Sequence, residues 1–294
     1  MAKPIKKALG IDIGGSGVKG APVHLKRGEL LAERFRIRTP RPATPKAVAN
    51  AVAEIAKHFR WKGPIGCTVP GLVRDGVVEM ASNLDPTWNG THVARLIKKK
   101  TGCKVAVMND ADAAGLAEMK YGAGKGKKGV VLLLTFGTGI GSALFLDGRL
   151  LPNTELGHLQ IGGQLAEDIA AHSVRETQDL EWYAWARGRV QEVIDHIEFL
   201  FSPDLIIIGG GASRPDRWAE FGHLLHTRAK LVPAALGNNA GIVGAGIVAR
   251  AQIPRKRKRG KKWLTNQPSS SLTGTTELFE GEDDGKAEGF SATS

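Results

Sequence analysis

Apolar residues along this chain occur in short runs, most of which end in glycine or in a turn-forming residue, and stretches with helical spacing lie between them. The runs predict strands, because four to eight apolar residues bounded by turn signals are typical of buried β-strands. The predicted strands cover residues 8–14, 18–25, 30–37, 64–69, 104–108, 130–136, 142–146 and 205–208.

The spacing of apolar positions between these strands predicts helices. The first begins at Thr44-Pro45, where threonine can cap the helix and proline fits its first turn. Further helices are expected at about 91–100, from about Asp110, at about 180–201 and at about 239–251. Because strands alternate with helices throughout, the pattern predicts an α/β fold.

The order of the elements predicts two related α/β domains that flank a cleft. We expect a small N-terminal domain at 1–109, closed by the C-terminal helix at about 239–251, and a large domain at 110–238. Beyond Ala251 the sequence becomes basic, then rich in Ser, Thr and Gly, and finally acidic. It contains few apolar residues, so 252–294 is predicted to be a disordered tail.

A glycine-rich turn follows the first strand and runs from Asp12 to Gly17. Glycine lets backbone N–H groups approach an anion, and a serine hydroxyl can add a hydrogen bond. The residues expected to bind phosphate here are Gly14, Gly15, Ser16 and Lys19. Asp12 is expected to contact Mg²⁺ through water, because Mg²⁺ keeps part of its hydration shell. Taken alone, the turn could equally be an ordinary hairpin, and it lacks the spacing of a P-loop.

A second turn of this kind follows the strand at 130–136, and a third glycine run follows the strand at 205–208. Finding two such turns favours a site for a chain of phosphates over a chance hairpin. The third run leaves room for a further phosphate or for a nucleotide to approach the backbone. The residues expected to bind phosphate in these two segments are Gly137, Thr138, Gly139, Gly210 and Gly211.

The pair Asn109-Asp110 lies between the first two glycine turns in the sequence, where a strand gives way to a helix. An aspartate beside a substrate hydroxyl can act as the base in phosphoryl transfer to an alcohol. Asn109 offers a donor and an acceptor that suit a sugar hydroxyl. The simpler alternative is that Asp110 only caps the helix that begins there.

A further cluster, from Glu155 to His158, has groups that suit a sugar. The glutamate can accept hydrogen bonds from two neighbouring hydroxyls, and His158 can add another. The glycine between them lets the loop approach a ligand closely. On these four residues alone, an exposed loop is the better interpretation.

The net charge of +12 belongs mainly to the folded part, because residues 252–294 contribute only +2 of it. This excess favours a polyanionic partner: nucleic acid, an anionic membrane or a phosphate polymer. Lysines near the turns are expected to hold a long polyanion; they are Lys98, Lys99, Lys100, Lys104, Lys125, Lys127 and Lys128. No apolar run approaches the length of a membrane span, and Cys67 and Cys103 are expected to be buried thiols in a reducing cytoplasm.

Together these motifs resemble the ROK family of sugar kinases, which has the actin-like ATPase (ribonuclease H-like) fold. The segments that carry the resemblance are 12–16, 109–111, 138–141 and 155–158. Residues 109–118 and 198–203 are most similar to the family's glucokinases that use inorganic polyphosphate. The resemblance extends over about residues 8–251.

The resemblance implies phosphorylation of glucose, with mannose as an alternative sugar, at the 6-hydroxyl, with polyphosphate or ATP as donor, Mg²⁺ as cofactor and Asp110 as base. It implies that the sugar is held by Asn83, Asn109, Glu155, His158 and Glu167, with Gly71 in a loop that closes against it. A homodimer fits the family. Many members carry a cysteine-rich zinc loop after the Gly-His motif, but residues 160–164 contain no cysteine, so we expect no zinc.

Three other functions stay open at this point. The first is an ATP-preferring glucokinase of the same fold, against which the positive charge argues weakly. The second is a sugar sensor without turnover, which an intact Asp110 and two phosphate turns argue against. The third is a basic nucleic-acid binder, which only the block at 255–262 supports, so we expect neither a specific nucleic acid nor a membrane as partner.

Overall fold

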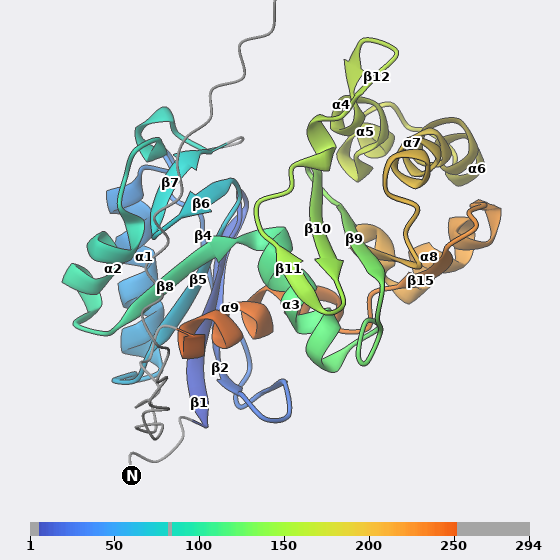
Figure 1. The fold of residues 1–294 in the computed structure, drawn as a ribbon. Helices are drawn as coiled ribbons and strands as arrows, with labels where there is room; N and C mark the ends of the chain where they lie inside the picture. Colours follow the sequence, from blue (N-terminus) through green and yellow to red (C-terminus); the bar gives the residue numbers. More distant parts are fainter. Residues whose placement is uncertain (1–5, 82–83, 252–294) are drawn as a thin grey trace, which may run out of the picture. The chain divides into compact units, whose positions relative to one another are not determined.

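The computed structural model describes residues 6–81 and 84–251, and within them two mixed β-sheets form the framework (Figure 1). The first sheet has the order β3-β2-β1-β5-β8, with β4 beside β2. Its strands are β1 (Lys7–Ile13), β2 (Gly17–His24), β3 (Glu29–Leu30), β4 (Phe35–Arg38), β5 (Ile65–Val69) and β8 (Val105–Asn109).

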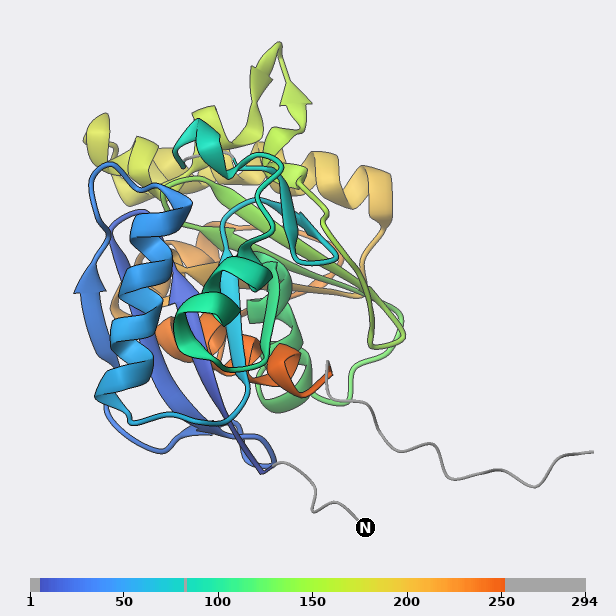
Figure 2. The same ribbon diagram turned by 90° about the vertical axis from the view of Figure 1, so that its left-hand side faces the viewer.

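Helices cover both faces of the first sheet (Figure 2). Successive residues of β1 point to opposite faces. Leu9 and Ile11 therefore pack with Val52 in one core, whereas Ala8 packs with Ile242 in another. The first core contains α1 (Pro45–His58) and α2 (Val93–Thr101), and the second contains α9 (Ala240–Ala251).

The second sheet has the order β11-β10-β9-β14-β15 and is likewise covered on both faces. Its strands are β9 (Val130–Phe136), β10 (Ile140–Leu146), β11 (Arg149–Leu151), β14 (Leu205–Gly210) and β15 (Lys230–Pro233). Leu134 and Phe136 pack with Trp185 on one face, and Leu133 packs with Ala114 of α3 (Asp110–Tyr121) on the other.

The remaining elements are short. The helices that cover the second sheet are α4 (Ala166–Ala170), α5 (His172–Thr177), α6 (Trp182–Trp185), the π-helical segment η3 (Ala186–Val190), α7 (Gln191–Phe201) and α8 (Pro215–Phe221). Two hairpins pair β6 (Leu72–Arg74) with β7 (Val77–Met80) and β12 (Gln160–Ile161) with β13 (Gln164–Leu165). The 3₁₀ turns are η1 (Pro86–Trp88), η2 (Leu156–His158), η4 (Gly211–Ser213), η5 (Gly222–Leu224) and η6 (Gly237–Asn239).

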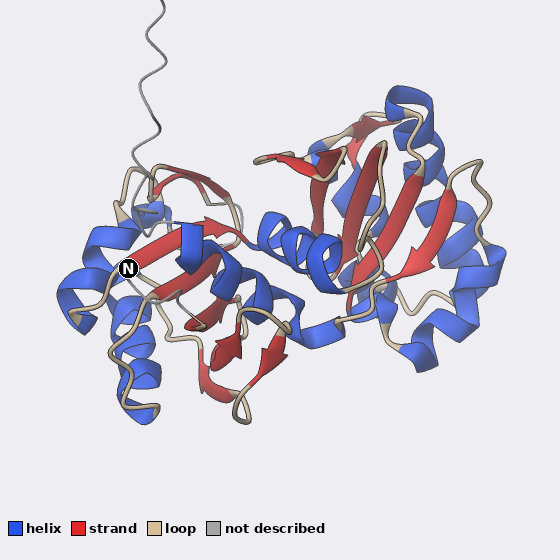
Figure 3. Ribbon diagram, turned by 60° about the horizontal axis from the view of Figure 1, so that its bottom comes forward, coloured by secondary structure: helices blue, strands red, loops and turns tan. Residues whose placement is uncertain are grey.

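Helix α9, labelled in Figure 1, packs closely on the first sheet and on α3 (Figure 3). Glycines make this close packing possible. A Cβ atom at Gly66 of β5 would overlap the carbonyl oxygen of Ala245. A Cβ at Gly244 would overlap the backbone of Ala113 in α3. Backbones that approach this closely leave no space for any side chain, so glycine is required at these positions.

The α/β fold class predicted from the sequence is confirmed, and most predicted elements are present. The predicted cap of the first helix is confirmed, because Thr44 Oγ1 accepts from Ala47 N at 3.3 Å. The predicted strand 30–37 is instead two strands, β3 and β4. They separate beside Pro22 of β2, which accepts from Leu31 N but has no N–H to donate in return.

The long helix predicted at 180–201 is divided into α6, η3 and α7. Gly188 lies in the π-helical segment, and glycine weakens a helix at that point. The predicted tail at 252–294 lies outside the described residues. No helix in the described part of the chain is long and apolar enough to cross a bilayer.

We predict that Gly244→Ala destabilises the protein by about 1–3 kcal/mol, the usual cost of forcing an extra methyl group into a packed contact. The added methyl group would meet the backbone of Ala113, which cannot turn away as a side chain could. Chemical denaturation would measure the change. Gly188→Ala is the matched control, since nothing lies within 4 Å of the position that its methyl group would take. The control should be neutral or stabilising, and equal losses in both variants would contradict the prediction.

Candidate active site

Asp110 is the first residue of α3, but it does not cap that helix. The cap is Asn109, whose Oδ1 accepts from Asp112 N at 2.9 Å. The Asp110 carboxylate accepts from the neighbouring Ala111 N at 2.8 Å. The simpler interpretation of Asp110 as a helix cap is therefore wrong, and its carboxylate is available for chemistry.

The surroundings of Asp110 raise its pKa to about 7. Burial is the largest cause, since it removes water from the charged form. The negative charges of Asp12 and Glu155 add to the shift. A carboxylate with a pKa near neutrality is well matched to accept a proton from a hydroxyl group and release it again.

Asn109 connects three segments around Asp110. Its side chain is 4% exposed, and its Nδ2 donates to Gly71 O at 3.1 Å and to Glu155 Oε1 at 3.3 Å. Its amide hydrogens are thus occupied by protein acceptors. In this state Asn109 positions the Gly71 loop and Glu155, and its predicted contact with a sugar would require the bond to Glu155 to be exchanged.

Gly71 and Gly157 let two loops approach their neighbours. Gly71 has φ +141°, and a Cβ there would overlap Met80 O, so the loop before β6 needs glycine. A Cβ at Gly157 would overlap Ile140 O, so η2 packs directly against β10. Asn83, the other predicted sugar ligand of this region, lies outside the described residues.

Glu155, His158 and Glu167 lie next to the second glycine turn. His158 Nε2 is 3.5 Å from Glu167 Oε1, and Glu167 Oε2 accepts from Ile140 N at 3.2 Å. Burial raises the pKa of Glu155, while His158 lowers it. The structure thus brings together three predicted sugar ligands that are up to 12 positions apart in the sequence.

The first glycine turn presents free backbone amides. Gly14 N donates to Gly17 O at 3.1 Å, and Thr39 Oγ1 donates to Gly14 O at 2.6 Å, which fixes the turn. Gly15 and Ser16 are exposed residues, and their backbone N–H groups have no acceptor among the described residues. Amides held in this way form a site for an anion.

Asp12 and Lys19 interact with each other beside this turn. Asp12 Oδ1 accepts from Thr68 Oγ1 at 2.8 Å, and Asp12 Oδ2 lies 3.7 Å from Lys19 Nζ. The ion pair partly neutralises the lysine that was predicted to bind phosphate. Asp12 also faces the beginning of α9, because a Cβ at Gly241 would lie 3.1 Å from the Asp12 carboxyl group.

The second and third glycine segments lie side by side, at the carboxyl ends of the neighbouring strands β9 and β14. Strands β9 and β14 are parallel, and Gly210 is opposite Phe136. Ser173 ties back the second turn, since its N and Oγ donate to Gly137 O at 3.0 Å and Thr138 O at 2.6 Å. With these carbonyl oxygens bound, the exposed Thr138 can face a ligand.

Residues of both the first and the second sheet lie close to the beginning of α3. Asp12 of the first turn is close enough for its charge to raise the Asp110 pKa. Gly141, which follows the second turn, approaches α3 so closely that a Cβ there would lie 3.0 Å from the Ala111 methyl group. The two glycine turns therefore flank the beginning of α3, as the order of the motifs predicts.

The lysines predicted to hold a long polyanion do not lie near the turns. Lys104 precedes β8, whereas Asp110 follows the other end of that strand. Lys128 likewise precedes β9, and the glycine turn follows its far end. Each strand spans roughly 15–20 Å, so the prediction that these lysines lie beside the turns was wrong. These lysines are near the motifs in sequence, but a full strand length separates them from the motifs in space.

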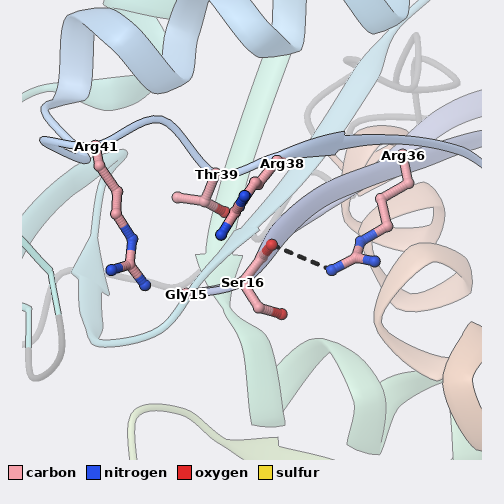
Figure 4. A pocket seen from close by; sticks show the side chains of 6 residues that line it. All are labelled: Gly15, Ser16, Arg36, Arg38, Thr39 and Arg41. Carbon is pink, nitrogen blue, oxygen red and sulfur yellow. Dashed lines mark hydrogen bonds between the residues drawn. The ribbon is translucent and has the colours of Figure 1, made fainter.

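Other functional candidates were missed in the sequence. A hollow of about 450 Å³ opens beside the first turn, and its lining includes Arg36, Arg38 and Arg41 (Figure 4). The signal was present in the segment Phe35-Arg36-Ile37-Arg38, where charged and apolar residues alternate as on the edge of a sheet.

Comparison with known proteins agrees with this geometry. The profile of the ROK family matches residues 8–179. The chain belongs to the ROK family. The polyphosphate glucokinase of Mycobacterium tuberculosis is 51% identical over 248 residues, which cover 84% of this chain and 92% of that protein.

Solved ROK structures are similar as well. The inorganic polyphosphate/ATP-glucomannokinase of Arthrobacter sp. strain KM is 49% identical, with a TM-score of 0.81 over 84% of this chain and all of that one. A ROK family glucokinase from Streptomyces griseus, at 23% identity and a TM-score of 0.70 over 83% of this chain and 99% of that one, shows the shared fold alone. The resemblance and the ROK, actin-like sugar kinase fold predicted from the motifs are confirmed.

The stretch that carries zinc ligands in many ROK proteins is a short hairpin here, formed by β12 and β13. Gly162 and Gly163 form its turn, both with positive φ. Within residues 6–81 and 84–251, no group of three His, Cys, Asp or Glu side chains is placed to hold a metal ion.

We predict that Asp110→Asn stabilises the protein at pH 8. A carboxyl whose folded pKa is raised from 3.8 to about 7 favours the fold only while protonated, so its contribution is lost as the pH rises through 7. The variant's gain in melting temperature should grow from pH 5.5 to about pH 7 and then level off. Exposed Asp168→Asn is the control. A gain that does not change with pH would contradict the raised pKa.

Proposed function

We propose that this chain transfers a phosphoryl group from inorganic polyphosphate, or from ATP, to the 6-hydroxyl of glucose to form glucose 6-phosphate. The observation that carries the proposal is Asp110, whose pKa is about 7 and which lies between two glycine turns. The names of the two relatives that are about half identical to this chain, a polyphosphate glucokinase and a polyphosphate/ATP-glucomannokinase, support it.

In the proposed mechanism, Asp110 accepts the proton of the sugar hydroxyl as that oxygen attacks the terminal phosphoryl group. The carboxylate must be deprotonated to do so. Its raised pKa makes it a stronger base than an exposed aspartate, and part of the population is still ionised at neutral pH.

We propose that Glu155, His158 and Glu167 hold the sugar hydroxyls, with Asn109 as the group that positions Glu155. The hydrogen bond from Asn109 Nδ2 to Gly71 O would let a sugar bound at Glu155 also fix the Gly71 loop. Asn83 is included in this proposal because of the family resemblance alone. Because the named relative from Arthrobacter is a glucomannokinase, mannose is proposed as a second sugar.

The backbone amides of Gly15 and Ser16, with Gly137, Thr138 and Gly139 across α3, are proposed to offset charge on the transferring phosphate. Gly210 and Gly211 are proposed to contact a further part of the donor. Gly210 has φ +74° and lies against the backbone of Phe136. Glycine at this position therefore lets the segment after β14 approach the glycine turn after β9.

Asp12 fits the proposed Mg²⁺ contact. It is a half-buried carboxylate beside free amides, and Mg²⁺ is usually held by one or two carboxylates together with substrate phosphates and water. When bound, Mg²⁺ supplies positive charge to the terminal phosphates. Thr68 holds one oxygen of Asp12 in place, and Lys19 lies near the other.

We also propose a homodimer, as the family resemblance implies. Phe199 and Leu200, near the end of α7, are 85% and 55% exposed. Large apolar side chains at neighbouring exposed positions are typical of surfaces that are covered by a partner. Light scattering of the wild type and of Phe199→Ser would test this surface.

We predict that the purified protein forms glucose 6-phosphate from glucose and Mg²⁺ with polyphosphate as donor, and more slowly with ATP. The rate with polyphosphate at a fixed, subsaturating concentration should fall as salt rises, because salt screens attraction to a polyanion. A coupled assay of glucose 6-phosphate measures both. Product from ATP alone would support a sugar kinase activity but would reject polyphosphate as its donor. No product from either donor would favour a sugar sensor.

We predict that Asp110→Asn lowers kcat by about 10²-fold or more, because asparagine cannot accept the proton. The wild-type rate should rise with pH through about 7, as Asp110 becomes ionised. Calorimetry should show glucose binding that is largely retained in the variant, which separates chemistry from binding. A variant with nearly full kcat would reject Asp110 as the base.

A further inference from the structure

The hollow beside the first glycine turn has basic walls. Its volume is about 450 Å³, and it is lined by Gly15, Ser16, Arg36, Arg38, Thr39 and Arg41. In Figure 4 the three guanidinium groups extend from one segment of chain toward the level of Gly15 and Ser16. The hollow therefore begins at the same amides that are proposed to bind the transferring phosphate.

The pairing of β4 with β2 places two of these arginines. Phe35 and Ile37 pack against the hydrophobic core, so Arg36 and Arg38 point to the opposite, exposed side. Arg38 is opposite Gly17, and Arg36 is opposite Lys19. The arginines are thus fixed in a defined register relative to the turn.

Two hydrogen bonds join this segment to the turn itself. Arg36 Nη2 donates to Ser16 O at 3.2 Å, and its guanidinium lies where a side chain at position 17 would be. Thr39, which is 5% exposed, donates to Gly14 O. The carbonyl oxygens of Gly14 and Ser16 are therefore bound, and the cationic groups line the hollow beside the turn.

The charge of the three arginines is not compensated by nearby carboxylates. None of them forms an ion pair in the part of the chain that the structure describes, and no acidic residue lines the hollow. Lys19, by contrast, is paired with Asp12. Guanidinium groups bind phosphate oxygens in pairs and stay charged at any pH at which the protein is folded.

We propose that Arg36, Arg38 and Arg41 bind the distal phosphates of a polyphosphate donor and give the enzyme its preference for long chains. The hollow has the volume of a site for an extended ligand rather than for one ion. It contains no aromatic or large apolar side chain on which an adenine could stack, which favours a phosphate chain over a nucleotide base. This inference rests on the proposed polyphosphate-dependent activity.

The test compares the wild type with Arg38→Gln, Arg41→Gln and a triple variant in which Arg36, Arg38 and Arg41 are all glutamine. KM is measured for long-chain polyphosphate, tripolyphosphate and ATP at two salt concentrations. The matched control changes Lys98, Lys99 and Lys100 to glutamine, which removes the same charge at the end of α2. All the changed side chains are exposed, so circular dichroism should show folded proteins.

We expect each single variant to raise KM for long-chain polyphosphate by about 10-fold, and the triple variant to raise it further and to weaken its salt dependence. KM for tripolyphosphate should rise less, because a donor of three phosphates fills less of the hollow and contacts fewer of the arginines than a long chain does. The lysine control should change KM by less than about 2-fold, as screened, distant charges do.

Three results would overturn the inference. One is an unchanged KM for long chains in the triple variant. Another is an equal rise for long chains, tripolyphosphate and ATP, which would mean that the arginines act on a part common to all donors. The third is an equal rise in KM in the lysine control, which would mean that the effect comes from the loss of net positive charge and not from the position of the arginines.

Failure of the proposed function is distinguishable from these results. If the wild type makes no product with any donor, calorimetric titration of polyphosphate into the wild type and the triple variant still measures the site. Binding that is lost in the triple variant would support the arginine site in a protein that is not a polyphosphate kinase. Equal binding in both would reject it.

Discussion

The structure depends on one constraint, the close approach of α9 to its neighbours. At Gly66 and Gly244 the backbone of α9 comes so near to β5 and to α3 that no side chain fits between them. Hydrophobic burial alone would not hold these elements in a single relative position, but backbones in direct contact leave little freedom. Because α9 begins beside Asp12 and α3 begins at Asp110, this packing also sets where the first glycine turn lies relative to the proposed base.

The beginning of α3 shows how a capping interaction can serve chemistry. Asn109 makes the capping bond to Asp112 N, so Asp110 is not the cap, although its carboxylate accepts from Ala111 N in the same first turn. The position after the cap would normally favour an ionised aspartate, because of the helix dipole. Burial and the charges of Asp12 and Glu155 outweigh this, and the pKa of Asp110 rises to about 7. The same Asn109 side chain holds Glu155 and Gly71 around the proposed base.

The sequence predicted local features well and distances through the fold poorly. The fold class, the helix from Thr44 and the glycine turns follow from patterns that span a few residues, and the set of motifs was specific enough to predict the family. The sequence could not tell that Asn109, and not Asp110, makes the capping bond, because both residue types cap helices equally well. It also misplaced the lysines that were predicted to hold a polyanion, since Lys104 and Asp110 are close in sequence but lie at opposite ends of β8. Arg36 and Arg38 were overlooked because their position depends on the pairing of β4 with β2, which is not a local property.

The arrangement of charge around the first turn resolves an electrostatic conflict. Asp12 and Glu155 lie close enough to Asp110 for their charges to raise its pKa, and a cluster of three carboxylates would repel an anionic donor. The ion pair of Lys19 with Asp12 reduces this repulsion, and uncompensated arginines line the hollow beside Gly15 and Ser16. A phosphate chain would then be attracted at its distal part and approach the carboxylates only with its end. The negative charge of that end would raise the pKa of Asp110 further, which would make the ionised carboxylate a stronger base but would lower the fraction of molecules in which it is ionised.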